Sequence, residues 1–248
     1  MYKTMPLLVL ILSLAAISPL RASADKDPYA NMAPVGQYLP ASQAAEIALA
    51  RSAGPAAVSD KAEILVLGAQ GYEKAVQGSN GFVCLVARAW GQDFDAPDFW
   101  NPKIHAPHCL NAAAASSVLP AYLERTRWVL AGVSKEEMLA RTKAAVAAHE
   151  IGSPAPGSMA YMLSKDQYIH DQQPGGSEPR WKPHVMWFVP TTEGSEWGAN
   201  VRGGPIFSGT SDVEPITTFI VLSPQWSDGS LGPYVPTPAA TTETHRHR

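Results

Sequence analysis

The chain has 248 residues and a formal net charge of −3, and 46% of its residues are hydrophobic against 17% charged. These proportions are typical of a globular protein and exclude a disordered, collagen-like or coiled-coil chain. A mildly acidic chain has no overall electrostatic attraction for nucleic acid or an anionic membrane. We therefore expect no nucleic acid partner.

The first 24 residues have the three-part pattern of a secretory signal peptide. Lys3 lies in a short n-region, residues 7–17 form an apolar run, and Ala22-Ser23-Ala24 is a cleavage site of the small-x-small type. An uncleaved membrane anchor is the alternative, but a spanning helix needs about 20 apolar residues. We therefore expect an exported protein, periplasmic or extracellular, with no membrane attachment after cleavage.

The remainder of the chain divides into three parts by composition. Residues 25–40 are rich in proline and aperiodic, which predicts an extended lead-in. Residues 231–248 combine proline and threonine with a basic His/Arg end, which is typical of a disordered tail. Residues 41–230 between them form the expected single domain.

The domain begins with a helix and a group of strands. Ser42 can cap a helix that runs to about residue 51. Short apolar stretches between glycine-rich turns then predict strands at 63–67, 72–77 and 82–90. Because Asn80-Gly81 suits a tight hairpin, we expect a three-stranded antiparallel meander. Its third strand is apolar on both faces and should lie centrally.

Cys84 lies in that third strand, and Cys109 is the only other cysteine in the chain. An even cysteine count in an exported protein favours a disulfide bond between them. Two free buried thiols are one alternative. A catalytic cysteine assisted by the neighbouring His108 is another.

A long connection at 91–110 leads to two expected helices. Asn111 opens an alanine-rich helical stretch that Pro120 interrupts and that ends near residue 132. Ser134 and Glu137 form a capping box, which predicts a second helix from 135 to about 149.

The last third of the domain alternates short apolar runs with long loops. Strands are expected at 158–163, 184–189 and 216–222, separated by loops at 164–183 and 190–215. The whole order predicts an α+β fold with a mostly antiparallel sheet of about six strands and helices mainly on one face.

Motifs of common enzyme families are missing from the sequence. It contains no nucleophile elbow, no HExxH zinc motif, no phosphate-binding loop and no glycine-rich dinucleotide motif. We therefore expect no cofactor, although missing motifs do not exclude catalysis.

Five segments resemble a family of uncharacterised secreted bacterial proteins with no assigned activity. They are Asn80–Cys84, Tyr161–Tyr168, Trp181–Pro190, Trp197–Asn200 and Trp226–Gly229. The resemblance implies an exported single domain. It implies no activity, cofactor or catalytic residue.

His184 is the most interesting candidate for chemistry, because it begins a strand directly after a long loop. That loop contains His170, Asp171 and Glu178, which could form an acid–base pair with His184 or contribute to a metal site. The alternative is that His184 bonds to a loop carbonyl and the other three side chains are solvated.

His105 and His108 form a second candidate, because on a helix an H-x-x-H pair shares one face and can hold zinc. Two prolines at 102 and 107 make a helix there unfavourable, so the alternative is a pair of surface-loop histidines.

Tryptophans are concentrated near the C-terminus. Trp181, Trp197 and Trp226 lie in turn-rich sequence, where aromatic rings can stack on a flat ligand. Trp187 alternates with apolar residues in an expected strand and should belong to the core.

These observations lead to two functional expectations. The first is a non-enzymatic exported domain that binds a small ligand or an envelope protein through the loops at 164–183 and 190–215. The alternative is an extracytoplasmic hydrolase that uses His184 with Asp171 or Glu178.

Overall fold

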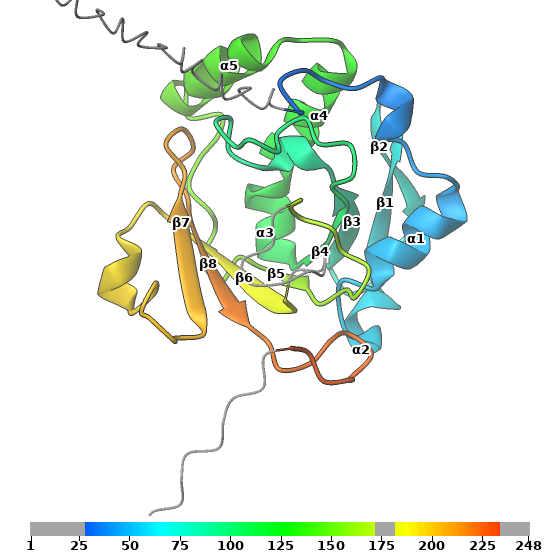
Figure 1. Ribbon diagram of the computed structural model, residues 1–248, viewed down its shortest axis with the longest axis vertical. Helices are drawn as coiled ribbons and strands as arrows, with labels where there is room; N and C mark the ends of the chain where they lie inside the picture. Colours follow the sequence, from blue (N-terminus) through cyan, green and yellow to red (C-terminus); the bar gives the residue numbers. More distant parts are fainter. Residues whose placement is uncertain (1–27, 172–181, 234–248) are drawn as a thin grey trace, which may run out of the picture.

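Eight strands form one sheet in the computed structural model, which describes residues 28–171 and 182–233 (Figure 1). The strand order is β2-β1-β3-β4-β5-β6-β8-β7. The strands are β1 (Glu63–Gly68), β2 (Gly71–Val76), β3 (Val83–Ala87), β4 (Ala106–Leu110), β5 (Met159–Met162), β6 (His184–Val189), β7 (Ile206–Thr210) and β8 (Thr217–Leu222). All pairs are antiparallel except β1 with β3, so the expected α+β fold with a mostly antiparallel sheet is confirmed. The sheet has eight strands instead of the expected six or so, because β4 and β7 were taken for loops.

Five α-helices accompany the sheet within the described residues. They are α1 (Gln43–Arg51), α2 (Ala56–Ser59), α3 (Ala112–Ser117), α4 (Leu119–Leu130) and α5 (Lys135–Ala147). Ser42, Asn111 and Ser134 cap α1, α3 and α5 with their side-chain oxygens, which accept backbone N–H groups of the first turn. Pro120 separates α3 from α4 by lying in the first turn of α4. The expected caps at Ser42 and Ser134, the helix start at Asn111 and the break at Pro120 are therefore confirmed.

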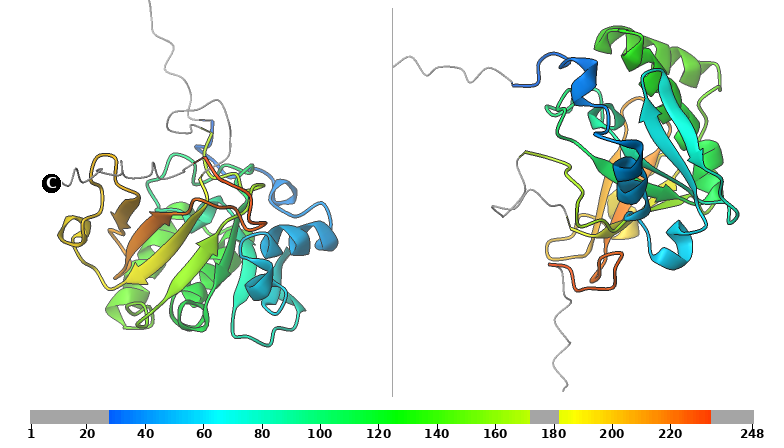
Figure 2. Two further views of the ribbon diagram at one scale, coloured as in Figure 1. Left: turned by 90° about the horizontal axis from the view of Figure 1, so that it is seen from below. Right: turned by 90° about the vertical axis from the view of Figure 1, so that its right-hand side faces the viewer.

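Helices cover both faces of the sheet, contrary to the expectation that they lie mainly on one (Figure 2). Alternate residues of β3 point in opposite directions, so Cys84 and Val86 face α1, whereas Leu85 and Ala87 face α3 and α4. Because β3 is apolar on both sides, each of its faces needs a covering layer. The predicted central, doubly covered strand is confirmed at β3.

The expected meander is wrong at its third strand. β1 and β2 form a hairpin, but β3 pairs with β1 in parallel on the opposite side from β2. The segment between β2 and β3 passes close to the start of β1. A Cβ atom on its Gly78 would lie 2.2 Å from the backbone nitrogen of Glu63. Instead of making a tight hairpin, Asn80 donates its side-chain amide to the Val58 carbonyl.

The connection expected at 91–110 ends in a strand that the sequence did not reveal. In β4, Cys109 is the register partner of Cys84 on β3, with their Cα atoms 4.0 Å apart. The two residues form the expected disulfide, so free thiols and a catalytic cysteine are both wrong. The bond joins two neighbouring strands in the middle of the sheet instead of tying a loop to it.

Two further segments are more ordered than expected. The loop at 190–215 contains a short 3-10 helix, η3 (Gly194–Trp197), and the edge strand β7. The lead-in contains another 3-10 turn, η1 (Val35–Gln37), which delivers Tyr38 into the core, where its hydroxyl donates to the Trp100 carbonyl at 2.7 Å. The described part of the lead-in, residues 28–40, thus belongs to the folded domain.

The expected signal peptide and most of the expected tail lie outside the described residues. Across the ranges 28–171 and 182–233, no helix is long and apolar enough to span a bilayer. The structure therefore supports a domain with an internal disulfide, which is consistent with export.

Candidate functional site

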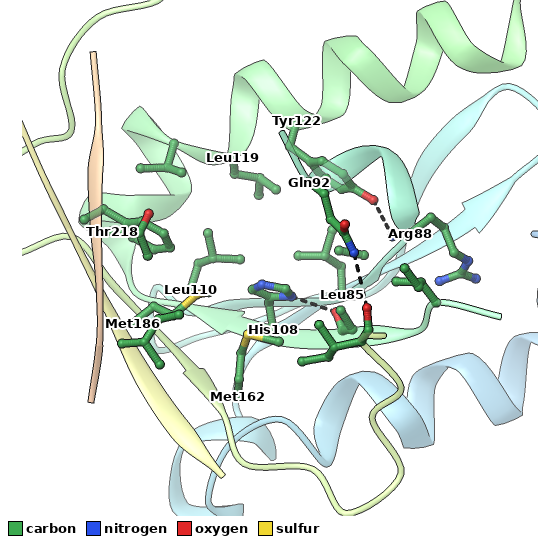
Figure 3. Close-up of a pocket in the computed structure, with 18 of the residues that line it drawn as sticks. Leu85, Arg88, Gln92, His108, Leu110, Leu119, Tyr122, Met162, Met186 and Thr218 are labelled. Carbon is green, nitrogen blue, oxygen red and sulfur yellow. Dashed lines mark hydrogen bonds between the residues drawn. The ribbon is translucent and has the colours of Figure 1, made fainter. Parts of the chain in front are cut away.

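A cavity of about 330 Å³ lies between α4 and the sheet (Figure 3). Its floor comes from the face of β3, β4, β5, β6 and β8 that points toward α3 and α4. Most of its lining is apolar, including Leu85, Leu110, Leu119, Met162, Met186 and Ile220. Cavities of this size that are mainly apolar with a few converging polar groups are typical of small-molecule sites.

Tyr122 holds the roof of the cavity in place. Its hydroxyl accepts the Arg88 backbone N–H at 2.8 Å and lies 3.0 Å from the Tyr72 hydroxyl. Tyr72 donates its own proton to the Val86 carbonyl at 2.6 Å, so the proton between the two tyrosines belongs to Tyr122. The Tyr122 hydroxyl is therefore fully used in joining α4 to β2 and β3.

Arg88 lines the cavity with its stem and directs its charge elsewhere. Its guanidinium is buried and forms an ion pair with Glu46 of α1 at 2.9 Å. Its Nε donates to the Tyr38 carbonyl at 2.7 Å. Burial raises the pKa of Glu46, and the charge and hydrogen bond of Arg88 oppose that rise. The pair links the lead-in, α1 and β3 behind the cavity wall.

Two histidines from different strands meet in this cavity. His108 comes from β4 and His184 from β6, and Met162, the register partner of His184, lies on the strand between them. Burial lowers the pKa of each imidazole from its ordinary value of 6.5 to about 4. Both rings are therefore neutral near pH 7.

The tautomer of each ring follows from its neighbour. The Nδ1 atom of His108 lies 2.7 Å from the Ala106 carbonyl oxygen, and that of His184 lies 2.8 Å from the Lys182 carbonyl oxygen. A carbonyl oxygen only accepts, so Nδ1 carries the proton in both rings. The alternative that His184 bonds to a loop carbonyl is thus confirmed, at Lys182.

The end wall of the cavity comes from the loop before β6. Ile169 and His170 line it, and Gln92 donates its amide to the Ile169 carbonyl at 3.2 Å. The His170 Nδ1 atom lies 3.5 Å from a carboxylate oxygen of Asp98. The described part of the loop expected to bind ligand therefore contributes one wall of the cavity.

Asp171, the next residue, belongs to a separate surface cluster. Its carboxylate accepts hydrogen bonds from Tyr29, Tyr168, Asn101 and Lys103. Partial burial would raise the pKa of Asp171, but these hydrogen bonds, the strongest from Tyr168, lower it to about 2. Through the hydrogen bond from Tyr29, Asp171 connects this loop to the lead-in.

A second, more polar hollow of about 260 Å³ adjoins the cavity. Both share Gln92, Tyr122 and Phe188, and the second adds an ion pair between Arg125 and Glu214. Arg125 also donates to the Gln92 carbonyl at 3.0 Å. The apolar chamber thus continues into a charged outer compartment.

The acid–base pairing expected for His184 is not assembled by the described residues. No carboxylate lines the apolar chamber among them, and Asp171 is held in its own cluster. Glu178 lies outside the described residues.

The expected zinc pair also separates. His105 and His108 lie in or next to a strand, where residues three apart point to opposite faces. His108 enters the cavity, whereas His105 bonds through Nδ1 to the Lys103 carbonyl. The described part of the chain contains no group of three or more side chains arranged to hold a metal ion.

The candidate tryptophans differ in their surroundings. Trp226 is buried at 8% exposure, Trp197 is 60% exposed beside Phe219, and Trp181 lies outside the described residues. Trp187, expected in the core, is 43% exposed, because none of the described helices packs on the face of β6 opposite the cavity. That prediction is wrong.

Sequence reasoning missed how His108, His184 and Tyr122 converge. The available signal was the alternation in β4, where Ala106, His108 and Leu110 share one face once the segment is taken as a strand. The proline at 107 hid it, because proline is unusual inside a sheet.

Comparisons with known proteins assign this chain to no family. No family model, curated protein or solved structure matches this chain.

Proposed function

We propose that this chain is an exported, non-enzymatic protein that binds a small molecule in the cavity between α4 and the sheet. The observation that carries the proposal is the mainly apolar chamber of about 330 Å³ containing the two neutral histidines His108 and His184. Binding an apolar molecule there removes its surface from water, which is favourable in proportion to the area buried.

The surroundings of the chamber support binding more than hydrolysis. A hydrolytic acid–base pair needs a second titratable group within hydrogen-bond reach of the histidine. Asp171 is engaged by four other donors outside the chamber. We therefore do not propose a hydrolase that pairs His184 with Asp171, and a pairing with Glu178 concerns a residue outside the described ranges.

Export is supported by two independent features. The N-terminal pattern ending at Ala24 is that of a signal peptide, and the Cys84–Cys109 disulfide is typical of oxidising compartments. Expression of the full gene product, fractionation and mass measurement should give a cell-envelope or medium species that begins at Asp25. A full-length cytosolic species would contradict export but would leave the proposed binding site in the cavity unaffected.

Binding is tested by thermal shift with single-ring probes, namely toluene, phenol and benzoate, on the non-reduced protein. A ligand that binds only the folded state raises the melting temperature with concentration. Ala106→Phe places a ring in the chamber floor and should remove the shift. Ala144→Phe, on the exposed face of α5, adds the same ring elsewhere and should keep it.

No shift by any probe, or an equal shift in the Ala106→Phe variant, would contradict the proposed site. Circular dichroism and the melting temperature of each unliganded variant show whether Ala106→Phe is folded, which makes its loss of binding interpretable.

A further inference from the structure

Resting on the proposed function, we infer that the cavity takes an uncharged, mainly apolar molecule that donates a hydrogen bond through a hydroxyl group to Nε2 of His108. Phenol is the simplest member of this class. The inference follows from the charges, the hydrogen-bonding state and the size of the chamber, taken in turn.

The described lining of the chamber offers a ligand no compensating charge. Arg88 is the only permanently charged residue among the described residues that line it, and its guanidinium is paired with Glu46 on the far side of the wall. His170, at the end wall, faces the carboxylate of Asp98. Burying an unpaired ion in such a place is costly, so neither a carboxylate nor an ammonium ligand is favoured.

The polar atom that the floor presents is an acceptor. Nδ1 of His108 donates its proton to the Ala106 carbonyl, so in the neutral ring Nε2 carries a lone pair. Figure 3 shows this ring standing in the chamber with only one of its nitrogens bonded to the backbone. A ligand that displaces water from this nitrogen must supply a donor in its place, or the lone pair loses its hydrogen bond.

The side-chain donors that line the chamber nearest to His108 are engaged elsewhere, and the Thr218 hydroxyl lies on β8, which two strands separate from β4. The Tyr122 hydroxyl donates toward Tyr72, and the Gln92 amide donates to the Ile169 carbonyl. Charged residues that could donate, such as Arg125, lie in the outer hollow and are held by Glu214. The acceptor on His108 is therefore best matched by a group on the ligand.

The volume is sufficient for one ring that carries a substituent, and about two rings are its upper limit. A fully apolar engineered cavity of about 150 Å³ binds benzene, and this chamber measures about 330 Å³. Leu85, Leu119 and Met186 supply the apolar contacts around such a ring.

The test compares phenol, toluene and benzoate by isothermal titration calorimetry at pH 7 on the non-reduced protein. In a chamber without an acceptor, phenol would bind more weakly than toluene because its hydroxyl loses its bonds to water. With His108 as acceptor, we expect phenol to bind about five- to tenfold more tightly than toluene, and benzoate to bind more weakly than either.

His108→Leu should abolish the preference for phenol while toluene still binds. His105→Leu, just before β4 and outside the chamber lining, is the matched control and should keep the preference. Should the His108→Leu variant fail to fold, ¹⁵N NMR of the wild-type imidazoles decides. Phenol should move the Nε2 resonance of His108, and toluene should leave it close to its unliganded position.

The outcomes separate the two claims. Equal binding of phenol and toluene, tighter binding of benzoate, or a phenol preference that survives in His108→Leu overturns the hydroxyl-donor inference and leaves the proposed binding site standing. Failure of all three probes to bind removes the proposed function and this inference with it.

Discussion

Replacing His184 with leucine should remove a defined pH dependence from the stability of the protein. His184 is 2% exposed, and burial lowers its pKa from 6.5 to about 4. Between pH 6.5 and about pH 4, His184 is protonated in the unfolded chain but neutral in the folded chain. The free energy of unfolding therefore decreases as the pH falls. A drop of this size corresponds to about 3 kcal/mol, present in full above pH 7 and lost by about pH 4.

The assay is urea unfolding of both proteins at intervals from pH 8 to pH 4 without reductant. The free energy of unfolding of the wild type minus that of His184→Leu should fall by about 3 kcal/mol over this range, because the subtraction cancels the carboxylates common to both proteins. Met186→Leu, another change in the cavity lining, should give a pH-independent difference. A flat difference for His184→Leu, or one that rises toward acid, would refute the reasoning.

Three further predictions concern the framework of the site. Glu46→Ala leaves the buried guanidinium of Arg88 unpaired and should cost about 3–5 kcal/mol in urea unfolding, whereas Glu46→Leu with Arg88→Met should cost much less; equal losses would contradict the ion-pair argument. Replacing both Cys84 and Cys109 with alanine should cost about 2–5 kcal/mol, and thiol titration of the unreduced, denatured wild type should detect no free thiol. Gly78→Ala forces a Cβ atom against backbone 2.2 Å away and should cost at least ~2 kcal/mol; an unchanged denaturation midpoint would show that the link can move aside.

Local signals in the sequence predicted the helices well. Ser42, Asn111 and Ser134 start helices in the structure because a short polar side chain satisfies N–H groups that the helix itself leaves unpaired. The strands at β5, β6 and β8 were also predicted, because apolar runs of strand length lie between turns. Both signals act within a few residues of the chain.

Strand pairing was predicted less well, because it depends on residues distant in sequence. The continuous apolar run at residues 82–87 indicates a doubly covered strand but does not specify which neighbour it pairs with. Edge strand β7 was hidden for a similar reason, since its stability comes from pairing with β8 more than from its own composition. The sequence does not distinguish a meander from a crossover. The close approach of Gly78 to the start of β1, which marks the crossover, is visible only in the structure.

The site shows the same limit. His184 was singled out because it starts a strand after a loop, but its relation to His108 depends on β5 lying between β4 and β6. His105 and His108 would share one face of a helix. In the extended chain at β4, residues three apart point to opposite faces, so the two side chains separate. Whether the Trp187 ring is covered depends on what packs on the outer face of the sheet, which β6 alone does not specify.

The cross-link between β3 and β4 has a consequence for how the protein matures. A chain with two cysteines permits a single intramolecular pairing, so oxidation cannot trap a scrambled isomer. Since the two sulfurs meet as register partners on neighbouring strands, assembly of the sheet itself brings them together. Maturation therefore needs an electron acceptor but no disulfide isomerase.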